Sequence, residues 1–275
     1  MKYQRFQQYL VRWYHLYGRH ELPWRQTTDP YAILVSELML QQTQVERVIP
    51  KYQAFMQKFP TAKVLASVQL DEVLRMWQGL GYNRRAKYLL QTASAVTSAG
   101  GEFPKTEEDL RALPGIGPYT ASAVACFSYN MPVTLIETNV RTVFLYHFFP
   151  DQTQVSDVEI LPLIKASLDQ KYPREWYWAL MDYGSYLKKV LPNPNRRSRQ
   201  YNKQAKFIGS KRQVRGEILR VLATQTRMTE PELQYLLTSN PEHYATALRD
   251  LVGEGLVHEQ SGKYGLANDT AQKEV

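Results

Sequence analysis

The sequence contains almost no cysteine: Cys126 is the single one among 275 residues. One cysteine forms no internal disulfide and builds no zinc or iron–sulfur site alone, so we expect no such cofactor. Long apolar runs are also missing, so we expect no membrane-spanning helix and no membrane partner. The first ten residues are polar and aromatic and lack the apolar stretch of a signal peptide. These absences together predict a reducing, cytoplasmic environment.

Basic residues outnumber acidic ones, so the formal net charge is +8 and the pI about 9.4. This excess suits a polyanionic partner, although many ordinary proteins are basic as well. A length of 275 residues is enough for two domains, each with a core of its own. The composition therefore predicts a globular protein and favours, without proving, a nucleic-acid partner.

Residues 1–190 show helical patterning and no alternating-strand region, and we expect them to form one mainly α domain. Asp29 and Pro30 are typical of a helix start, as N-cap and first helical residue. Apolar residues then recur at helical spacing. Further helices are predicted at 44–58, 70–78, 84–98, 138–148, 156–170 and 174–189.

The composition changes between 188 and 215, where ten basic residues occur without an acidic one. Pro192 and Pro194 exclude a continuous helix. We interpret 191–212 as a linker. It either lies along a phosphate backbone or is a merely solvated tether, and charge alone does not separate the two.

Residues 213–268 are predicted to form a small α+β domain, followed by a tail at 269–275. Helices are expected at about 214–223, from Thr229 with Glu232 in a capping box, and from Asn240 to about 253. Two strands, 256–260 and 263–266, follow with a hairpin turn between them. Three helices and a hairpin are typical of a winged helix-turn-helix, which binds DNA or other proteins.

Residues 113–121 have the sequence Leu-Pro-Gly-Ile-Gly-Pro-Tyr-Thr-Ala and break the helical pattern between two short predicted helices. Thr106 is expected to cap the first of these helices. Gly115 and Gly117 have no Cβ, so their backbone turns tightly and can come close to a ligand. Their N–H groups and those of the next helix start are expected to point the same way, which favours an anion such as a DNA phosphate. We interpret the segment as a helix-hairpin-helix, with an ordinary corner between helices as the alternative.

Glu37 lies inside the apolar pattern of its helix, on the same face as Ile33, Leu40 and Gln41. A carboxyl group facing a core is hard to ionise, so we expect its pKa to rise. Such an acid can give its proton to a leaving group near neutral pH. The alternative is a glutamate that reaches the helix edge or pairs with an arginine.

Glu137 follows the apolar run 133–136 and precedes the helix that Thr138 or Asn139 opens. Helix N-termini stabilise negative charge, so we expect the pKa of Glu137 to fall and the group to be an anion. Simple helix capping is the alternative. An acid and an anion that face one sugar are the pair that cleaves a glycosidic bond through an oxocarbenium-like state.

Between about Trp13 and Lys188 the chain resembles the helix-hairpin-helix DNA glycosylases, and among them the MutY-like adenine DNA glycosylases. Besides the hairpin, the motifs are Leu-Pro-Trp-Arg (22–25), Ser-Glu-Leu-Met-Leu-Gln-Gln-Thr-Gln-Val (36–45), Trp-Gln-Gly-Leu-Gly-Tyr (77–82), Glu-Thr-Asn-Val-Arg (137–141) and Trp-Ala-Leu-Met-Asp-Tyr-Gly (178–184). The second motif is highly specific for this branch. The resemblance implies a two-lobed helical HhH-GPD glycosylase fold.

The resemblance also implies roles for particular residues. Glu37 would protonate a purine at N7, and Gln41 and Tyr82 would enter the duplex beside a flipped base. Tyr119 stands where related bifunctional lyases carry a Schiff-base lysine, which implies a monofunctional enzyme. The predicted catalytic residues are Glu37, Glu137, Tyr119 and Asn139. The predicted DNA contacts are Gln41, Gln42, Thr43, Tyr82, Arg85, Leu113, Gly115, Gly117, Tyr119, Thr120, Lys188, Arg196, Arg197 and Arg199. A monovalent cation at the hairpin carbonyls near Leu113 and Gly115 follows from the resemblance alone.

Three features depart from the family pattern. The family's anion is an aspartate, whereas this chain has Glu137, whose extra methylene moves the carboxylate by roughly 1–1.5 Å. The four-cysteine iron–sulfur segment is missing, with Leu187 and a Pro/Arg-rich stretch in its place. The Nudix-like C-terminal domain that senses 8-oxoguanine is replaced by the predicted winged helix.

The sequence thus predicts a monomeric, nucleoid-associated base-excision enzyme of bacterial type. It would act on double-stranded DNA with a lesion or mismatch, and adenine is the leading target. Two alternatives stay open. One is a glycosylase for another base, such as hypoxanthine, a deaminated or alkylated purine, or a mismatched pyrimidine. The other is a DNA-binding or regulatory protein on the same scaffold with weakened catalysis.

Overall fold

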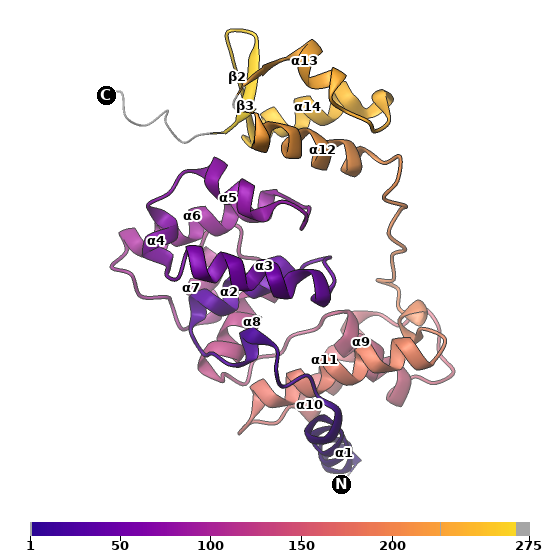
Figure 1. Cartoon of the computed structure of the whole chain (residues 1–275). Helices are drawn as coiled ribbons and strands as arrows, with labels where there is room; N and C mark the ends of the chain where they lie inside the picture. The colour runs from indigo at the N-terminus through magenta and orange to yellow at the C-terminus, as the bar shows by residue number, and fades with distance from the viewer. Residues whose placement is uncertain (1, 226, 268–275) are drawn as a thin grey trace. The chain divides into compact units, whose positions relative to one another are not determined.

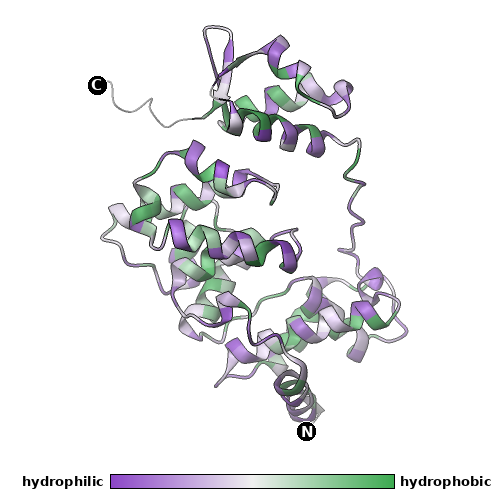
Figure 2. Ribbon diagram, viewed as in Figure 1, coloured by the Kyte–Doolittle hydropathy of each residue, from purple (hydrophilic) through white to green (hydrophobic). Residues whose placement is uncertain are grey.

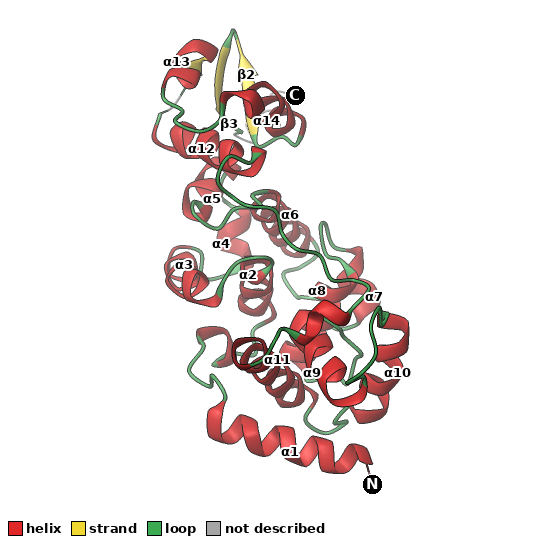
Figure 3. Ribbon diagram, turned by 90° about the vertical axis from the view of Figure 1, so that its right-hand side faces the viewer, coloured by secondary structure: helices red, strands yellow, loops and turns green. Residues whose placement is uncertain are grey.

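The computed structural model describes residues 2–225 and 227–267, and helices dominate these ranges (Figure 3). The chain is divided into two compact units. The first contains residues 2–33, 104–112 and 116–203; the second contains 34–103, 113–115 and the described residues from 204 to 267. The predicted helical domain 1–190 is therefore shared between both units, and the C-terminal region belongs to the second. Among the described residues no helix is long and apolar enough to cross a membrane.

The first unit is built from helices that are distant in sequence. They are α1 (Lys2–Tyr17), α7 (Glu107–Ala112), α8 (Pro118–Tyr129), α9 (Thr138–Phe148), α10 (Asp157–Ser167) and α11 (Pro173–Val190), with short 3-10 turns at Pro23–Arg25 and Pro194–Arg197 (Figure 1). Packing of α11 against both α1 and α9 forms its centre, where Trp176, Tyr177 and Phe144 are fully buried. Sequence analysis did not predict α1, which has no acidic residue in its first turn.

The second unit contains most of α2 (Pro30–Leu40), with α3 (Val45–Lys58), α4 (Ala62–Ala66), α5 (Leu70–Trp77) and α6 (Arg84–Ser98). The start of α2 is confirmed, since Asp29 Oδ1 accepts a hydrogen bond from Tyr31 N over 3.1 Å. All residues from Tyr31 to Met39 are buried, so α2 is a core helix on every side rather than the one-sided helix that the sequence suggested. The short helix α4 was not predicted.

The C-terminal part of the second unit contains the elements of the predicted plan. They are α12 (Lys211–Thr224), α13 (Glu230–Tyr235), a 3-10 turn at Pro241–His243, α14 (Tyr244–Gly253) and the antiparallel strands β1 (Met228–Thr229), β2 (Val257–Gln260) and β3 (Lys263–Leu266). The sheet order is β1-β3-β2, and β1 adds one strand to the predicted hairpin. The capping box of Thr229 and Glu232 is confirmed. α12 carries both hydrophobic and hydrophilic residues, as an amphipathic helix does (Figure 2).

Candidate active site

Glu37 is a carboxylic acid inside a core helix. Its residue is 7% exposed, and its neighbours Ser36, Leu38 and Met39 are each 1% exposed or less. Such surroundings oppose the charged form of a carboxyl group. The structure therefore supplies the burial on which the prediction of a proton donor depends, and the raised pKa itself stays a prediction.

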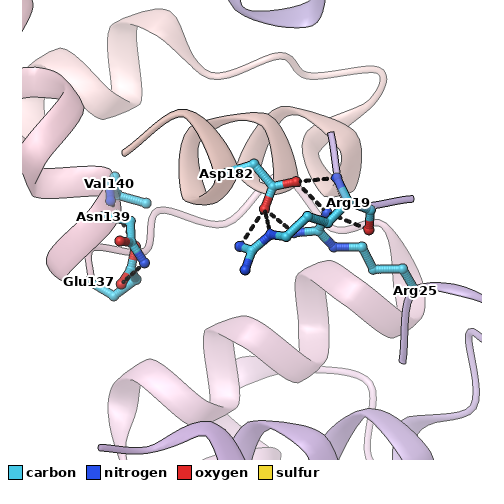
Figure 4. Close-up of polar contacts among 6 residues, drawn as sticks. All are labelled: Arg19, Arg25, Glu137, Asn139, Val140 and Asp182. Carbon is cyan, nitrogen blue, oxygen red and sulfur yellow. Dashed lines mark hydrogen bonds and ion pairs between the residues drawn. The ribbon is translucent and has the colours of Figure 1, made fainter. Parts of the chain in front are cut away.

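Glu137 is the N-cap residue of α9. Its Oε1 accepts a hydrogen bond from Val140 N over 2.7 Å, and its Oε2 accepts one from Asn139 Nδ2 over 3.1 Å (Figure 4). The capping that was weighed as an alternative is thus present. It does not exclude a chemical role, because both oxygens are held in place at a helix N-terminus, where negative charge is stabilised.

The pKa of Glu137 moves in the direction opposite to our expectation. Loss of hydration raises it, although hydrogen bonds from the backbone of Asn139 and Val140 and the charges of Lys188 and Arg141 work against the rise. The hydrogen bonds at the helix start do favour the anion, as expected, but burial is the larger effect here. Glu137 therefore needs nearby cations to serve as an anion.

Lys188, on α11, is the cation best placed for that purpose. Arg141 is already paired with Asp157, with nitrogen–oxygen distances of 2.6 and 2.8 Å. Within the described ranges no carboxylate lies within ion-pair distance of Lys188, and burial lowers its pKa while Glu137 raises it. Sequence analysis assigned Lys188 to DNA contact, and the structure adds this electrostatic relation to Glu137.

Gly184 lets α11 approach the start of α9 closely. A Cβ at this position would lie 2.2 Å from the backbone oxygen of Asn139 and 2.8 Å from its Cα. A Cβ could be accommodated only if the start of α9 moved, because the atoms that it would meet belong to the backbone. Asn139 Oδ1, at the same place, is buried with no hydrogen-bond partner among the described residues, although buried acceptors are normally paired.

Gly184→Ala is expected to displace Glu137 and Asn139. We predict that the free energy of unfolding falls by about 1–3 kcal/mol because the site becomes overpacked. We also predict that any glycosidic activity falls at least about tenfold, since small displacements in an active site are costly. Thermal unfolding and single-turnover kinetics measure the two effects. The matched control is Gly216→Ala within α12, where a Cβ meets nothing within 4 Å; equal behaviour of the two variants would contradict the argument.

The turn after α2 holds Gln41, Gln42 and Thr43 next to the loop that carries Tyr82, and Arg85 fastens them together. The Arg85 side chain donates to the carbonyl oxygens of Leu38, Met39, Gln41, Leu80, Gly81 and Tyr82. Its residue is 6% exposed, and burial lowers the pKa of Arg85 to about 10. The structure thus gives Arg85 a different role from the predicted DNA contact: it positions the loops that carry Gln42 and Tyr82.

The predicted hairpin is present between α7 and α8. Thr106 Oγ1 accepts from Asp109 N over 3.1 Å, which confirms the predicted cap. Gly115 has a left-handed backbone (φ +72°), and a Cβ there would clash with Tyr88. Gly117 is the N-cap of α8 in an extended conformation, with nothing within 4 Å of an added Cβ, so this glycine leaves open space outside the backbone. Leu113, Tyr119 and Thr120 lie in or next to this hairpin, but Thr120 is buried at 3% exposure.

The basic residues after α11 divide into two groups. Arg196 and Arg199 are exposed. Arg197 instead donates to the carbonyl oxygens of Leu145 (2.9 Å) and Phe149 (2.6 Å) and to that of Pro150, at the end of α9. Arg197 therefore completes a helix C-terminus, which its place in a basic run did not predict.

A buried ion cluster joins α11 to the segment that follows α1 in the first unit. Asp182, on α11, binds Arg19 and Arg25, each through two side-chain nitrogens (Figure 4). Arg25 and Asp182 belong to two separate sequence motifs, 22–25 and 178–184. The two lie 157 positions apart, and no local pattern signals their pairing.

Glu37 belongs to the second unit and Glu137 to the first, so their convergence on one nucleotide stays a prediction.

Three comparisons show which known proteins this chain is similar to. A sequence profile of the HhH-GPD superfamily of base excision DNA repair proteins matches residues 35–162. The chain is 36% identical to the adenine DNA glycosylase of Mycolicibacterium smegmatis over 94% of this chain and 95% of that protein. It is 39% identical to the thymine-DNA glycosylase of Aeropyrum pernix over 48% of this chain and 60% of that protein. Among solved structures, a thermostable thymine-DNA glycosylase has a TM-score of 0.60 at 24% identity, covering 67% of this chain and 86% of its own, which is a likeness of fold.

Proposed function

This chain belongs to the HhH-GPD superfamily of base excision DNA repair proteins and is a DNA N-glycosylase, and we propose that it removes adenine from duplex DNA. The observation that carries the choice of adenine is the 36% identity to the mycobacterial adenine DNA glycosylase along nearly the whole length of both proteins. At 94% coverage that match extends beyond the helical core into the C-terminal region, which supports the choice.

The chemistry follows from the two carboxyl groups. The adenine must leave the base stack, because its glycosidic bond is unreachable inside the duplex. Glu37 gives a proton to N7, and the C1′–N9 bond then breaks with its electron pair leaving on the base. Glu137 stabilises the cationic sugar, water adds at C1′ and loses a proton to a carboxylate, and an abasic site remains. We assign Asn139 Oδ1, which is buried and has no partner among the described residues, as the acceptor of a hydrogen bond from that water.

Glu137 replaces the aspartate that the resemblance leads one to expect. Its longer side chain caps α9 with one oxygen and binds Asn139 with the other. We propose that these two bonds and the charge of Lys188 compensate for the added methylene, so that the pocket is fitted to Glu rather than inactivated by it.

An iron–sulfur cluster does not fit this chain. Cys126, its single cysteine, is buried in α8, whereas the resemblance would place four cysteines after α11. That connection is held otherwise: Val155 N donates to Arg197 O over 3.0 Å, and Arg199 N donates to Val155 O over 2.9 Å. We propose that these bonds and the guanidinium of Arg197 order the segment without a cluster.

DNA backbone contacts are assigned to the hairpin and to the exposed cations Arg196, Arg199 and Lys203. Phosphate contacts release counterions, so affinity should fall steeply with salt. The monovalent cation at the hairpin carbonyls stays a prediction.

One assay tests the proposed function. The protein is incubated with duplexes that carry adenine opposite 8-oxoguanine, guanine or cytosine, and half of each sample is then heated in alkali. We expect strand breaks at adenine only after alkali, as a monofunctional glycosylase produces. Breaks without alkali would overturn the interpretation of Tyr119, and release of no base from any duplex would favour the weakened DNA-binding protein.

A mismatched pyrimidine is the second candidate substrate, because the chain is also 39% identical to a thymine-DNA glycosylase over about half its length. Duplexes with thymine or uracil opposite guanine decide between the two. Faster excision of thymine than of adenine would replace the first proposal with the second.

The pH dependence of excision should reveal the charge of Glu137. Because its pKa is raised, lowering the pH protonates it earlier than an ordinary carboxylate, and activity is lost on the acid side. Lys188→Gln removes a cation that opposes this rise, so the acid limb should move to higher pH. We expect a loss in single-turnover rate of about fivefold or more at pH 5.5 and less than about twofold at pH 8.

The matched control is the exposed neighbour Lys189→Gln, which removes the same charge from DNA attraction. Both variants should bind DNA more weakly to a similar degree. An acid limb that moves equally in both, or in neither, contradicts the assignment of Lys188.

A further inference from the structure

Gln42 and Tyr82 form a hydrogen-bonded pair at the edge of the second unit. Tyr82 Oη donates to Gln42 Oε1 over 2.8 Å. Both residues have left-handed backbones, with φ of 56° and 48°, which residues other than glycine rarely adopt. Such strain persists where the surrounding structure imposes it, and it gathers at functional sites. Here Arg85 supplies the restraint through the carbonyl oxygens described above.

The segment 204–212 brings two further polar groups to the hydroxyl of Tyr82. Gln204 Nε2 donates to Gln42 Oε1 over 3.0 Å and to Tyr82 Oη over 2.5 Å. Arg212 Nη1 donates to Tyr82 Oη over 2.8 Å, and its guanidinium carbon lies 5.7 Å from the Tyr82 ring centre. The same guanidinium lies 5.5 Å from the ring centre of Phe207. An amide and a guanidinium therefore contact the residue that is predicted to enter DNA, and the guanidinium also lies against a second aromatic ring.

Arg212, Phe207 and Ile208 together suit contact with bases rather than with phosphates alone. Arg212 is the second residue of α12, whose N-cap Ser210 accepts a hydrogen bond from Gln213 N, so its backbone is fixed in a helix. Phe207 is 53% exposed and Ile208 is 85% exposed within an otherwise polar, basic segment. Exposed apolar side chains beside arginines are typical of surfaces that stack on bases or enter base steps.

We propose that segment 204–212 recognises the base opposite the excised one, with Arg212 as the hydrogen-bonding residue and Phe207 as the stacking surface. The inference rests on the proposed function, in which adenine leaves the stack and the base opposite it loses its partner, and on the predicted entry of Tyr82 into the duplex. A guanidinium matches the two adjacent acceptors of a guanine edge, whereas cytosine presents a donor there and an abasic position presents nothing. The chain thereby reads the opposite strand with residues outside its helical core.

Arg212→Ala tests the proposal on four duplexes, with adenine opposite 8-oxoguanine, guanine, cytosine or a tetrahydrofuran abasic analogue. Single-turnover rates are measured in the wild-type background, and dissociation constants are measured in a Glu37→Gln background that does not depend on excision. We expect the preference for the guanine-type opposites over the abasic analogue to fall about tenfold or more in both measurements. The values for the abasic analogue should stay within about twofold of the parent protein.

The matched control is Arg220→Ala, which removes the same charge from the same helix at an exposed position. It should leave the preference unchanged. An equal loss of rate and affinity on all four duplexes would show that Arg212 contacts phosphate. A gain on all four would show that the segment covers the DNA-binding surface and has to be displaced by DNA. Either result overturns the proposal. Absence of adenine release by the parent protein would instead overturn the proposed function, while the dissociation constants still report on Arg212.

Discussion

Glu37→Gln is expected to lower the rate constant of adenine excision by about 10³-fold, within the range by which general acids accelerate reactions. An amide of nearly the same shape has no proton to give to N7, so the leaving group would depart as an anion. Affinity for the duplex should change by less than about threefold, because the backbone contacts are made elsewhere. Single-turnover kinetics and fluorescence anisotropy with the same duplex measure the two quantities.

The control for Glu37→Gln is Glu102→Gln, an exposed carboxylate of the same unit. It should leave both quantities unchanged. A melting temperature within a few degrees of the parent protein would show that the buried amide is tolerated, so that the lost rate is chemical. Normal excision by Glu37→Gln would remove the proton donor from the mechanism and leave Glu137 as the only assigned carboxyl group.

Features governed by neighbouring residues could be predicted from the sequence. The caps formed by Asp29, Thr106 and Thr229 are present as expected, because each cap depends on backbone groups two or three positions away. The helices that these residues begin follow from the same local chemistry. The left-handed glycine of the hairpin, Gly115, belongs to this class as well.

Features governed by distant contacts could not be predicted. Arg85 and Arg197 both occur in surroundings that suggested DNA contact, yet each binds carbonyl oxygens at the end of a helix. The pKa of Glu137 depends on burial that the sequence does not show, and burial outweighs the helix N-terminus. The close approach of Gly184 to Asn139 likewise joins two motifs that are adjacent only in the folded chain.

Asp182→Asn is expected to reduce the free energy of unfolding of the first unit by about 3–5 kcal/mol. Asp182 is 4% exposed and the Arg25 side chain is likewise 4% exposed, so the substitution leaves a buried guanidinium without its carboxylate. Arg25 also lies 5.4 Å from the ring centre of Trp178, so it cannot leave without disturbing that packing. Denaturant unfolding followed by tryptophan fluorescence reports on this unit, which contains Trp13, Trp24, Trp176 and Trp178.

The pH dependence of stability separates this ion cluster from ordinary packing. Burial alone would raise the pKa of Asp182, but the hydrogen bonds and charges of Arg25 and Arg19 outweigh it and hold the pKa below its ordinary value. The unfolded chain therefore binds the proton first, and the stability supplied by Asp182 is present above the unfolded pKa and lost as the pH falls through the folded one. Asp182→Asn should lack this component of acid destabilisation. Asp250→Asn, which breaks a largely exposed pair with Lys211, should cost much less stability than Asp182→Asn. An equally small cost for Asp182→Asn would show that the buried cluster does not stabilise the α11 side of the site.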